Sequence, residues 1–150
     1  MDPVTLRPAV PDDVPVFFEH QLDPEATRMA AFPSRDRDAH RAHWEKILAD
    51  DACVTMTVVA GTVVAGNMLS WVDGDKREIG YWIGREHWGR GIASAALPQL
   101  LELLTERPLY AYVAEHNAGS ARVLEKSGFT QQGAERGDAG VTLLVYVLER

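Results

Sequence analysis

A long segment without charge constrains the fold of this chain more than any other feature. No Asp, Glu, Lys or Arg occurs from Ala52 to Val72, a length that could cross a lipid bilayer. However, Gly61 and Gly66 interrupt the segment, and its Val and Thr content favours β-strands. We therefore predict two buried strands, residues 53–60 and 63–71, joined by a turn near Gly61.

The remaining elements follow from hydrophobic periodicity and from helix-breaking residues. Further strands are expected at residues 4–9, 77–84, 109–114, 130–136 and 141–148. Helices are expected from Asp12 or Asp13, as N-cap, to Leu22, and at residues 38–49, 92–106 and 118–127. Residues 21–36 are expected to be irregular, and Pro98 should kink the helix that contains it or delay its start. This order predicts an α/β (mixed α+β) fold, with helices on both faces of a mixed, mostly antiparallel sheet.

Composition limits the class of protein. The chain has 150 residues, 46% of them hydrophobic and 25% charged, which is typical of a single globular domain spanning residues 1–150. Its formal net charge of −7 argues against a nucleic acid or a membrane as partner. The lone Cys53 and an N-terminus without a secretory pattern favour a cytoplasmic location. The histidines show no metal-ligand spacing along the chain, so no metal site is expected.

A loop with two glycines is the first candidate binding feature. Gly89 and Gly91 flank Arg90, and the expected helix begins at Ile92. The first N–H groups of a helix lack intrahelical partners, and glycine lets an anion approach the backbone closely. The pattern favours a diphosphate held mainly by main chain, and the alternative is a tight turn that needs glycine for positive φ. The loop is not a Walker loop, because no Gly-Lys-Ser/Thr follows its first glycine. It does not match a dinucleotide-binding fingerprint, because Ser94 stands where a third Gly or Ala is needed.

A second motif, EHNAGSARVLEKSGF, follows the strand expected at residues 109–114. Together with EIGYWIG and EHWGRGIASAAL it resembles the GNAT superfamily of acyl-CoA-dependent N-acyltransferases, and more narrowly its RimJ/RimL-type branch. The family pattern N-x-x-S-x-x-V-L-E-K-x-G-F matches from Asn117 to Phe129. Trp88 departs from the usual Gln or Arg of the family's pyrophosphate loop, although W-G-x-G is a familiar form in this branch. The resemblance implies a GNAT-like fold.

The resemblance also implies a cofactor, acetyl-CoA, and the residues that bind it. Ile83 would pair with the pantetheine arm, and Asn117 would bond to the same side of the cofactor. The pyrophosphate would lie on the main chain of Trp88, Gly89, Arg90, Gly91, Ile92, Ala93 and Ser94. For Asn117, an ordinary N-cap is the structural alternative, and both roles are compatible.

Two residues are candidates for proton transfer by the same resemblance. Glu78 occupies the position where many GNAT members carry a catalytic base, with an exposed strand charge opposite Arg77 as the alternative. The family's usual acid, a tyrosine, is replaced by Leu124, and Ser120 stands where the RimJ/RimL branch places its acid. A capping or packing serine is the alternative for Ser120.

The expected activity is acetyl transfer to a primary amine by direct attack in a ternary complex. The acceptor would be a small-molecule amine or a protein N-terminus, held by residues 21–32 and the helix with Trp44, and a homodimer is left open. Two other functions stay open: a non-catalytic acyl-CoA-binding sensor, favoured by the missing tyrosine, and more remotely a nucleotide-diphosphate binder.

Overall fold

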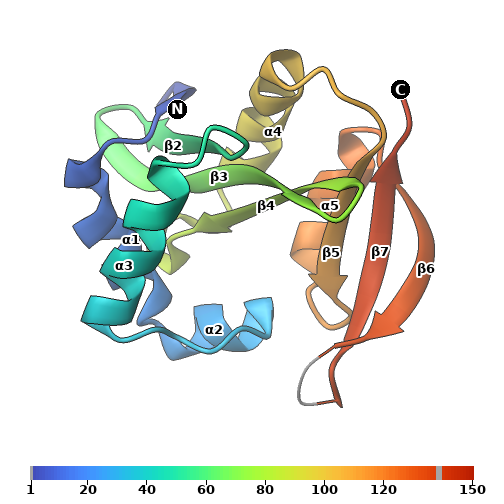
Figure 1. Ribbon diagram of the computed structural model, residues 1–150, viewed down its shortest axis with the longest axis horizontal. Helices are drawn as coiled ribbons and strands as arrows, with labels where there is room; N and C mark the ends of the chain where they lie inside the picture. The colour runs from blue at the N-terminus through green and yellow to red at the C-terminus, as the bar shows by residue number, and fades with distance from the viewer. Residues whose placement is uncertain (1, 138–139) are drawn as a thin grey trace.

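A single sheet forms the centre of the molecule. The computed structural model describes residues 2–137 and 140–150, and within them seven strands pair in the order β1-β2-β3-β4-β5-β7-β6 (Figure 1). All neighbouring strands are antiparallel except β4 and β5, which are parallel. The strands are β1 Val4–Pro8, β2 Val54–Ala60, β3 Val63–Asp73, β4 Lys76–Ile83, β5 Leu109–Ala114, β6 Thr130–Arg136 and β7 Thr142–Leu148.

Helices cover both faces of this sheet, as predicted. Figure 1 shows α1 and α3 in front of the strands β2 to β4, and α4 and α5 behind the sheet. Among the described residues no helix is both long enough and apolar enough to cross a membrane. The helices are η1 Pro11–Asp13, α1 Val14–Gln21, α2 Pro24–Ala30, α3 Arg37–Leu48, η2 Arg85–His87, α4 Ile92–Leu103 and α5 Ala118–Lys126.

The uncharged segment forms the predicted hairpin. β2 and β3 pair on either side of Gly61, whose φ of 63° is the left-handed conformation that a turn requires. Val58 and Met68 are completely buried in the core, where they join Leu97 and Leu100 of α4. The absence of charge in this segment therefore reflects a central position in the sheet.

The prediction for residues 21–36 is wrong, because this segment contains α2. The Asp23 carboxylate accepts hydrogen bonds from the amides of Glu25 and Ala26, and Pro24 occupies the first helical position. An N-cap aspartate followed by proline is a helix-start signal, since proline lacks the N–H that would be unsatisfied there. The helix ends at Ala31, whose φ is 53°.

The helix α4 begins at the predicted residue and ends three residues earlier than predicted. It begins at Ile92, so Pro98 does not delay its start, and it ends at Leu103 rather than at residue 106. The side chain of Gln99, the residue after Pro98, bonds to both β1 and α4: Nε2 donates to the carbonyls of Val4 and Ala95, and Oε1 accepts from the Leu6 amide. These bonds fix α4 against the edge of the sheet.

Helix α5 begins at the predicted residue and ends at Lys126, one residue earlier than predicted. The Asn117 side chain accepts from the Ser120 amide, which makes it the N-cap. At the other end Gly128 has a φ of 96°, and the amides of Gly128 and Phe129 donate to the carbonyls of Glu125 and Leu124. This is the paired hydrogen bonding of a Schellman motif, and it sets the position of the following strand.

Asp13 connects the first strand, the first helix and β2. It lies at the start of α1, but its carboxylate makes no cap bond, contrary to the predicted role of an N-cap. It accepts instead from Arg7 Nη1 and Nη2 at 2.7 and 2.8 Å, from the Val10 amide at 3.0 Å and from Thr57 Oγ1 at 2.7 Å. The hydrogen bonds from Arg7, above all, lower the pKa of the buried Asp13 to about 2.

We predict that Asp13→Asn lowers the free energy of unfolding by about 2 kcal/mol at pH 7, whereas Asp12→Asn on the exposed neighbour changes it little. A carboxyl whose pKa is depressed on folding stabilises the protein above its unfolded pKa of 3.8 and loses that effect as the pH falls towards about 2. Denaturant unfolding at several pH values measures both effects. A difference between wild type and Asp13→Asn that persists unchanged at pH 2 would contradict the assignment.

Candidate functional site

The strands β4 and β5 separate soon after they meet. Only Arg77 with Leu109 and Glu78 with Tyr110 form pairs between them, although β4 continues to Ile83. The Trp82 carbonyl faces β3, since it lies 2.2 Å from the position that a Cβ on Gly66 would occupy. Because successive carbonyls of a strand point to opposite edges, the main-chain groups of Tyr81 and Ile83 face the gap towards β5.

A cavity of about 450 Å³ lies at this gap. Its walls come from α2, the end of β4, the glycine loop with the start of α4, and the start of α5. Most of the predicted cofactor residues line it: Ile83, Trp88, Gly89, Gly91, Ile92, Ala93, Ser94 and Asn117. Ser120 lines it as well, whereas Arg90 and Glu78 are absent from its wall. Two motifs that are distant in sequence therefore meet around one cavity.

The glycine loop is open to an incoming group. Gly89 and Gly91 have φ of 79° and 72°, and a Cβ added to either would meet no described heavy atom within 4 Å. Gly91 is the N-cap of α4 and contributes no side-chain cap, so the first amides of a 12-residue helix have no partner from that residue's side chain. This geometry is compatible with both interpretations of the sequence, a turn and a diphosphate site. The positive φ values shape the turn, and the missing side chains leave the amides accessible.

Trp88 crosses the open end of β4. Its indole Nε1 donates to the Ile83 carbonyl at 2.9 Å, and 40% of the residue is exposed. The residue that departs from the usual family pattern thus bonds to the strand end that the sequence assigns to the cofactor. This contact joins the loop to β4.

Ser120 has a partner that the sequence did not reveal. Its Oγ lies 2.7 Å from the Tyr81 hydroxyl, which also donates to the Ser120 carbonyl at 3.2 Å. Burial raises the pKa of Tyr81 to about 12, and the hydrogen bond with Ser120 opposes that shift. The alternation of β4 could have placed Tyr81 beside Ile83, but not opposite a serine 39 positions later.

Glu78 lies at the point where β4 and β5 part. Its partner across the parallel pair is Tyr110, and Tyr81 lies three positions further along β4, so the side chains of Glu78 and Tyr81 point to opposite faces of the strand. Burial, followed by the nearby Asp73 carboxylate, raises the pKa of the half-buried Glu78. Arg77 does not pair with it but contacts Glu106 at 3.2 Å.

Helix α2 lies over the cavity and is attached at both ends. Arg85 Nη1 of η2 contacts the Asp23 carboxylate at 3.3 Å, and His116 Nε2 donates to the Arg28 carbonyl at 2.7 Å. Ala26, Met29 and Ala30 form the intervening wall of the cavity. Of the expected acceptor-binding segments, α2 therefore lines the cavity.

The other expected acceptor segment does not reach the cavity. Trp44 of α3 is buried against Phe17, with ring centroids 4.7 Å apart, and is not among the cavity-lining residues. Trp44 therefore packs against α1 and does not form part of the cavity wall.

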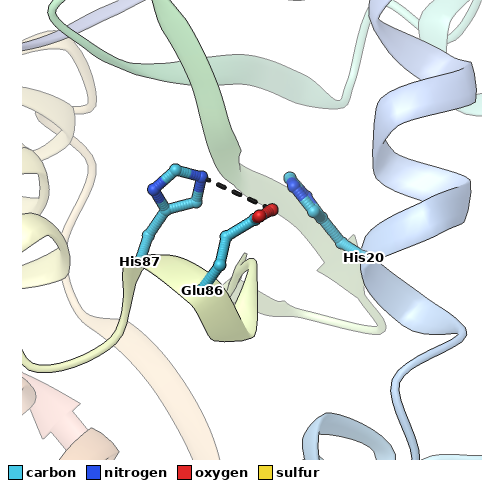
Figure 2. A group of neighbouring side chains, drawn as sticks. All are labelled: His20, Glu86 and His87. Carbon is cyan, nitrogen blue, oxygen red and sulfur yellow. Dashed lines mark ion pairs between the residues drawn. The ribbon is translucent and has the colours of Figure 1, made fainter.

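The structure also assembles a cluster that spacing along the chain did not indicate. Figure 2 shows His20 at the end of α1 directed towards Glu86 and His87 of η2. One potential ligand atom from each residue lies within 4.8 Å of those of the other two. Burial lowers the pKa of His20. Residues 20 and 86 are far apart in sequence, so only the docking of α1 beside the end of β4 unites them.

Comparison with known protein families gives a match that covers both the sheet up to β5 and the glycine loop. A family model described as an acetyltransferase (GNAT) domain matches residues 4–130, which include the strand gap, the glycine loop and the Asn117 motif. The chain belongs to the GNAT acetyltransferase family. The predicted family and fold class are confirmed, and membership makes the chain an N-acetyltransferase by family.

A relative from Bacillus licheniformis supports the same assignment. It is named an uncharacterized N-acetyltransferase p20 and is 31% identical over 147 residues, which cover 89% of this chain and 82% of the relative. The match extends over most of both chains.

Solved acetyltransferases share the fold at low sequence identity. RimL, a ribosomal L7/L12 alpha-N-protein acetyltransferase solved with coenzyme A, superposes with a TM-score of 0.81 at 18% identity, covering 96% of this chain and 92% of RimL. The aminoglycoside acetyltransferase AAC(6')-Ib, solved with paromomycin and acetyl-CoA, gives 0.83 at 20% identity, covering 99% and 94%. At these identities the likeness concerns the fold.

The Tyr81–Ser120 contact generates a prediction about stability. We expect Tyr81→Phe to lower the free energy of unfolding by about 1 kcal/mol, because it removes a hydrogen bond within the wall of the cavity while keeping the ring. Chemical denaturation of wild type and variant gives the difference. An unchanged unfolding midpoint would show that the hydroxyl contributes no net stability there.

Proposed function

We propose that this protein transfers an acetyl group from acetyl-CoA to a primary amine by direct attack in a ternary complex. The observation that carries the proposal is the cavity at the β4–β5 gap, which joins an unpaired strand edge, a helix N-terminus and the Asn117 motif. Its volume of about 450 Å³ falls in the range of small-molecule sites.

The chemistry of the wall fits the parts of coenzyme A. A pyrophosphate would bind at the start of α4, where the main chain from Trp88 to Ser94 presents amides and the helix dipole favours negative charge. A pantetheine arm carries amide groups, and the edge of β4 at Tyr81 and Ile83, which no strand pairs, offers the strand-like partners that such groups need once the Trp88 indole releases the Ile83 carbonyl. Asn117 uses its oxygen as the N-cap, so its amide N–H groups are left for a carbonyl of the cofactor.

Acetyl-CoA supplies an activated acyl group as a thioester, and the amine must be neutral to attack it. An alkyl amine with a pKa near 10.4 is neutral in only about one molecule in 2,500 at pH 7. Attack forms the C–N bond, breaks the C–S bond and leaves a thiolate, while the nitrogen loses a proton. The enzyme therefore needs a proton acceptor for the amine and a proton donor for the sulfur.

Glu78 is the proposed acceptor of the amine proton. Its raised pKa makes the carboxylate a stronger base than an exposed glutamate, because burial and Asp73 both disfavour the charged form. Since Glu78 does not line the cavity, an ordered water between it and the amine completes the transfer in this proposal.

Ser120 is the proposed donor to the leaving thiolate. It lines the cavity, and the contact between its Oγ and the Tyr81 hydroxyl at 2.7 Å holds the serine side chain in place. Leu124 stands where many family members carry a tyrosine, so a hydroxyl from the preceding turn of α5 would replace that function. A thiol with a pKa of about 8.5 needs only weak assistance as a leaving group.

The acceptor class is a primary amine, either on a small molecule or at a protein N-terminus. RimL and AAC(6')-Ib, named for a protein and for aminoglycosides, share this fold. The net charge of −7 favours a cationic acceptor through long-range attraction. In this proposal the α2 side of the cavity admits the amine.

One prediction of this proposal concerns the glycine loop. Gly91→Glu should weaken coenzyme A binding at least tenfold, about 1.4 kcal/mol, because a carboxylate would stand against the pyrophosphate. Gly74→Glu is a matched control: it shares a positive φ (64°) and open surroundings, but it lies in the β3–β4 turn. Calorimetric titration of both variants measures the affinities, and equal affinities would mean that the loop does not hold the diphosphate.

The second prediction concerns the reaction. Glu78→Gln should reduce kcat/KM by about 10² to 10⁴ and shift the pH profile to higher pH, because the amine must then lose its proton to solvent. Glu102→Gln, an exposed change on α4, is the control. Release of free thiol from acetyl-CoA with a panel of N-terminal peptides, polyamines, amino acids and aminoglycosides measures the rate. An unaltered pH profile would remove Glu78 as the base.

The missing tyrosine favours one alternative, a GNAT domain that binds acyl-CoA without turning it over. The same panel separates the two functions. Coenzyme A binding without thiol release for any amine would support the sensor, and steady turnover with one amine would exclude it.

A further inference from the structure

The cluster of His20, Glu86 and His87 takes no part in the proposed transfer chemistry, although His87 also lines the cavity. His20 comes from α1, and the other two residues come from η2, directly before the glycine loop (Figure 2). The two histidines are 7% and 8% exposed, although imidazoles are polar groups that normally require partners when buried. We propose that these three side chains bind a divalent transition-metal ion, with Zn²⁺ as the representative.

The hydrogen bonding of the two imidazoles is incomplete. The Nδ1 atoms of both His20 and His87 are buried and have no hydrogen-bond partner among the described residues. His87 Nε2 lies 3.7 Å from Glu86 Oε1, which is too long for a hydrogen bond. The ring centroids of the two histidines are 6.3 Å apart at 82°, so the rings meet edge to face, a contact that supplies no hydrogen bond to their nitrogens. Two buried rings therefore converge on a carboxylate without the bonds that would otherwise stabilise them.

The distances suit closure around one ion. All three ligand atoms lie within 4.8 Å of one another, while a tetrahedral zinc site with bonds of about 2.0–2.2 Å separates its ligands by about 3.3 Å. The side chain of Glu86 is 74% exposed, compared with 9% for His87, so the carboxylate is the ligand that is free to move inward. Its exposure also provides the path by which an ion enters.

The backbone holds His20 close to η2. A Cβ added to Gly84 would lie 2.6 Å from the His20 ring, so glycine at the end of β4 is what allows the ring to pack there. The Arg85–Asp23 contact fastens the segment after α1 to η2 beside it. The two histidines are therefore positioned by the fold, as a binding site requires.

The donor set selects the class of ion. Imidazole nitrogen and a single carboxylate favour Zn²⁺, Co²⁺ or Ni²⁺, whereas Ca²⁺ and Mg²⁺ prefer all-oxygen sites. Three protein ligands leave one position for water, as in open rather than closed zinc sites. Bound metal would join the end of α1 to η2 and so stabilise the segment that leads into the glycine loop.

Binding is tested with untagged protein, without coenzyme A, after treatment with a chelator. Equilibrium dialysis with Zn²⁺ and metal analysis should give one ion per chain, and Glu86→Gln should weaken binding at least about tenfold. Glu115→Gln, which alters another exposed glutamate directly after β5, should bind like wild type. No saturable binding below about 1 mM, or equal affinity in wild type and Glu86→Gln, would overturn the proposal.

Cobalt provides a spectroscopic test that does not depend on activity. Co²⁺ added to wild type should give the intense visible absorption of a low-symmetry site with nitrogen ligands, and His87→Gln should abolish it. His43→Gln, a histidine of α3 outside the cluster, should leave the spectrum unchanged. Circular dichroism confirms that His87→Gln is folded. A spectrum that persists in folded His87→Gln, or disappears in His43→Gln, would overturn the assignment.

Discussion

The early separation of β4 from β5 is the constraint on which the rest of the structure depends. Parallel strands require a crossover, and here α4 and its glycine loop make the connection between the two strands. Because only two residue pairs join them, the remaining edge of β4 lacks the partner that a sheet normally supplies. Backbone groups that face such a gap must be satisfied by solvent, side chains or a ligand. The cavity, the accessible helix start and the position of α5 all follow from this divergence.

Much of the fold was predictable because its signals are local. β5 and β6 have the predicted bounds, and the Asn117 cap and Gly128 stop of α5 lie at the predicted residues. The segment with α2 was misassigned because its prolines were taken as breakers, although Asp23-Pro24 is a cap followed by a favoured first position. Asp12 or Asp13 was predicted as the N-cap of the first helix from residue type alone, whereas the Asp13 carboxylate accepts hydrogen bonds from Arg7 of β1 and Thr57 of β2. Contacts across the sheet outcompeted the local rule.

The residues of the candidate site also divide into those that local sequence indicates and those that only tertiary packing brings together. The glycine loop and the Asn117 motif are each contiguous in sequence, so their resemblance to the two motifs of the family implies a shared ligand. The Tyr81–Ser120 contact and the His20–Glu86–His87 cluster each join segments that only tertiary packing brings together. The hydrophobic periodicity along the chain does not indicate such contacts. The assigned roles of Glu78 and Ser120 stay predictions, while the structure adds the environment in which each would act.

The bond between Trp88 and Ile83 has a consequence for how ligands are chosen. The indole satisfies a carbonyl that the proposed pantetheine arm would need, so binding is an exchange of one donor for another rather than an addition to an empty edge. The affinity for the ligand is then lowered by the free energy needed to release the indole. In the same way, affinity is lowered whenever only a fraction of the protein is in the binding-competent state. A ligand that fills the cavity but lacks a suitable N–H cannot complete this exchange. In the proposed function the tryptophan would therefore compete with the ligand for this carbonyl and favour carriers that bear an amide N–H.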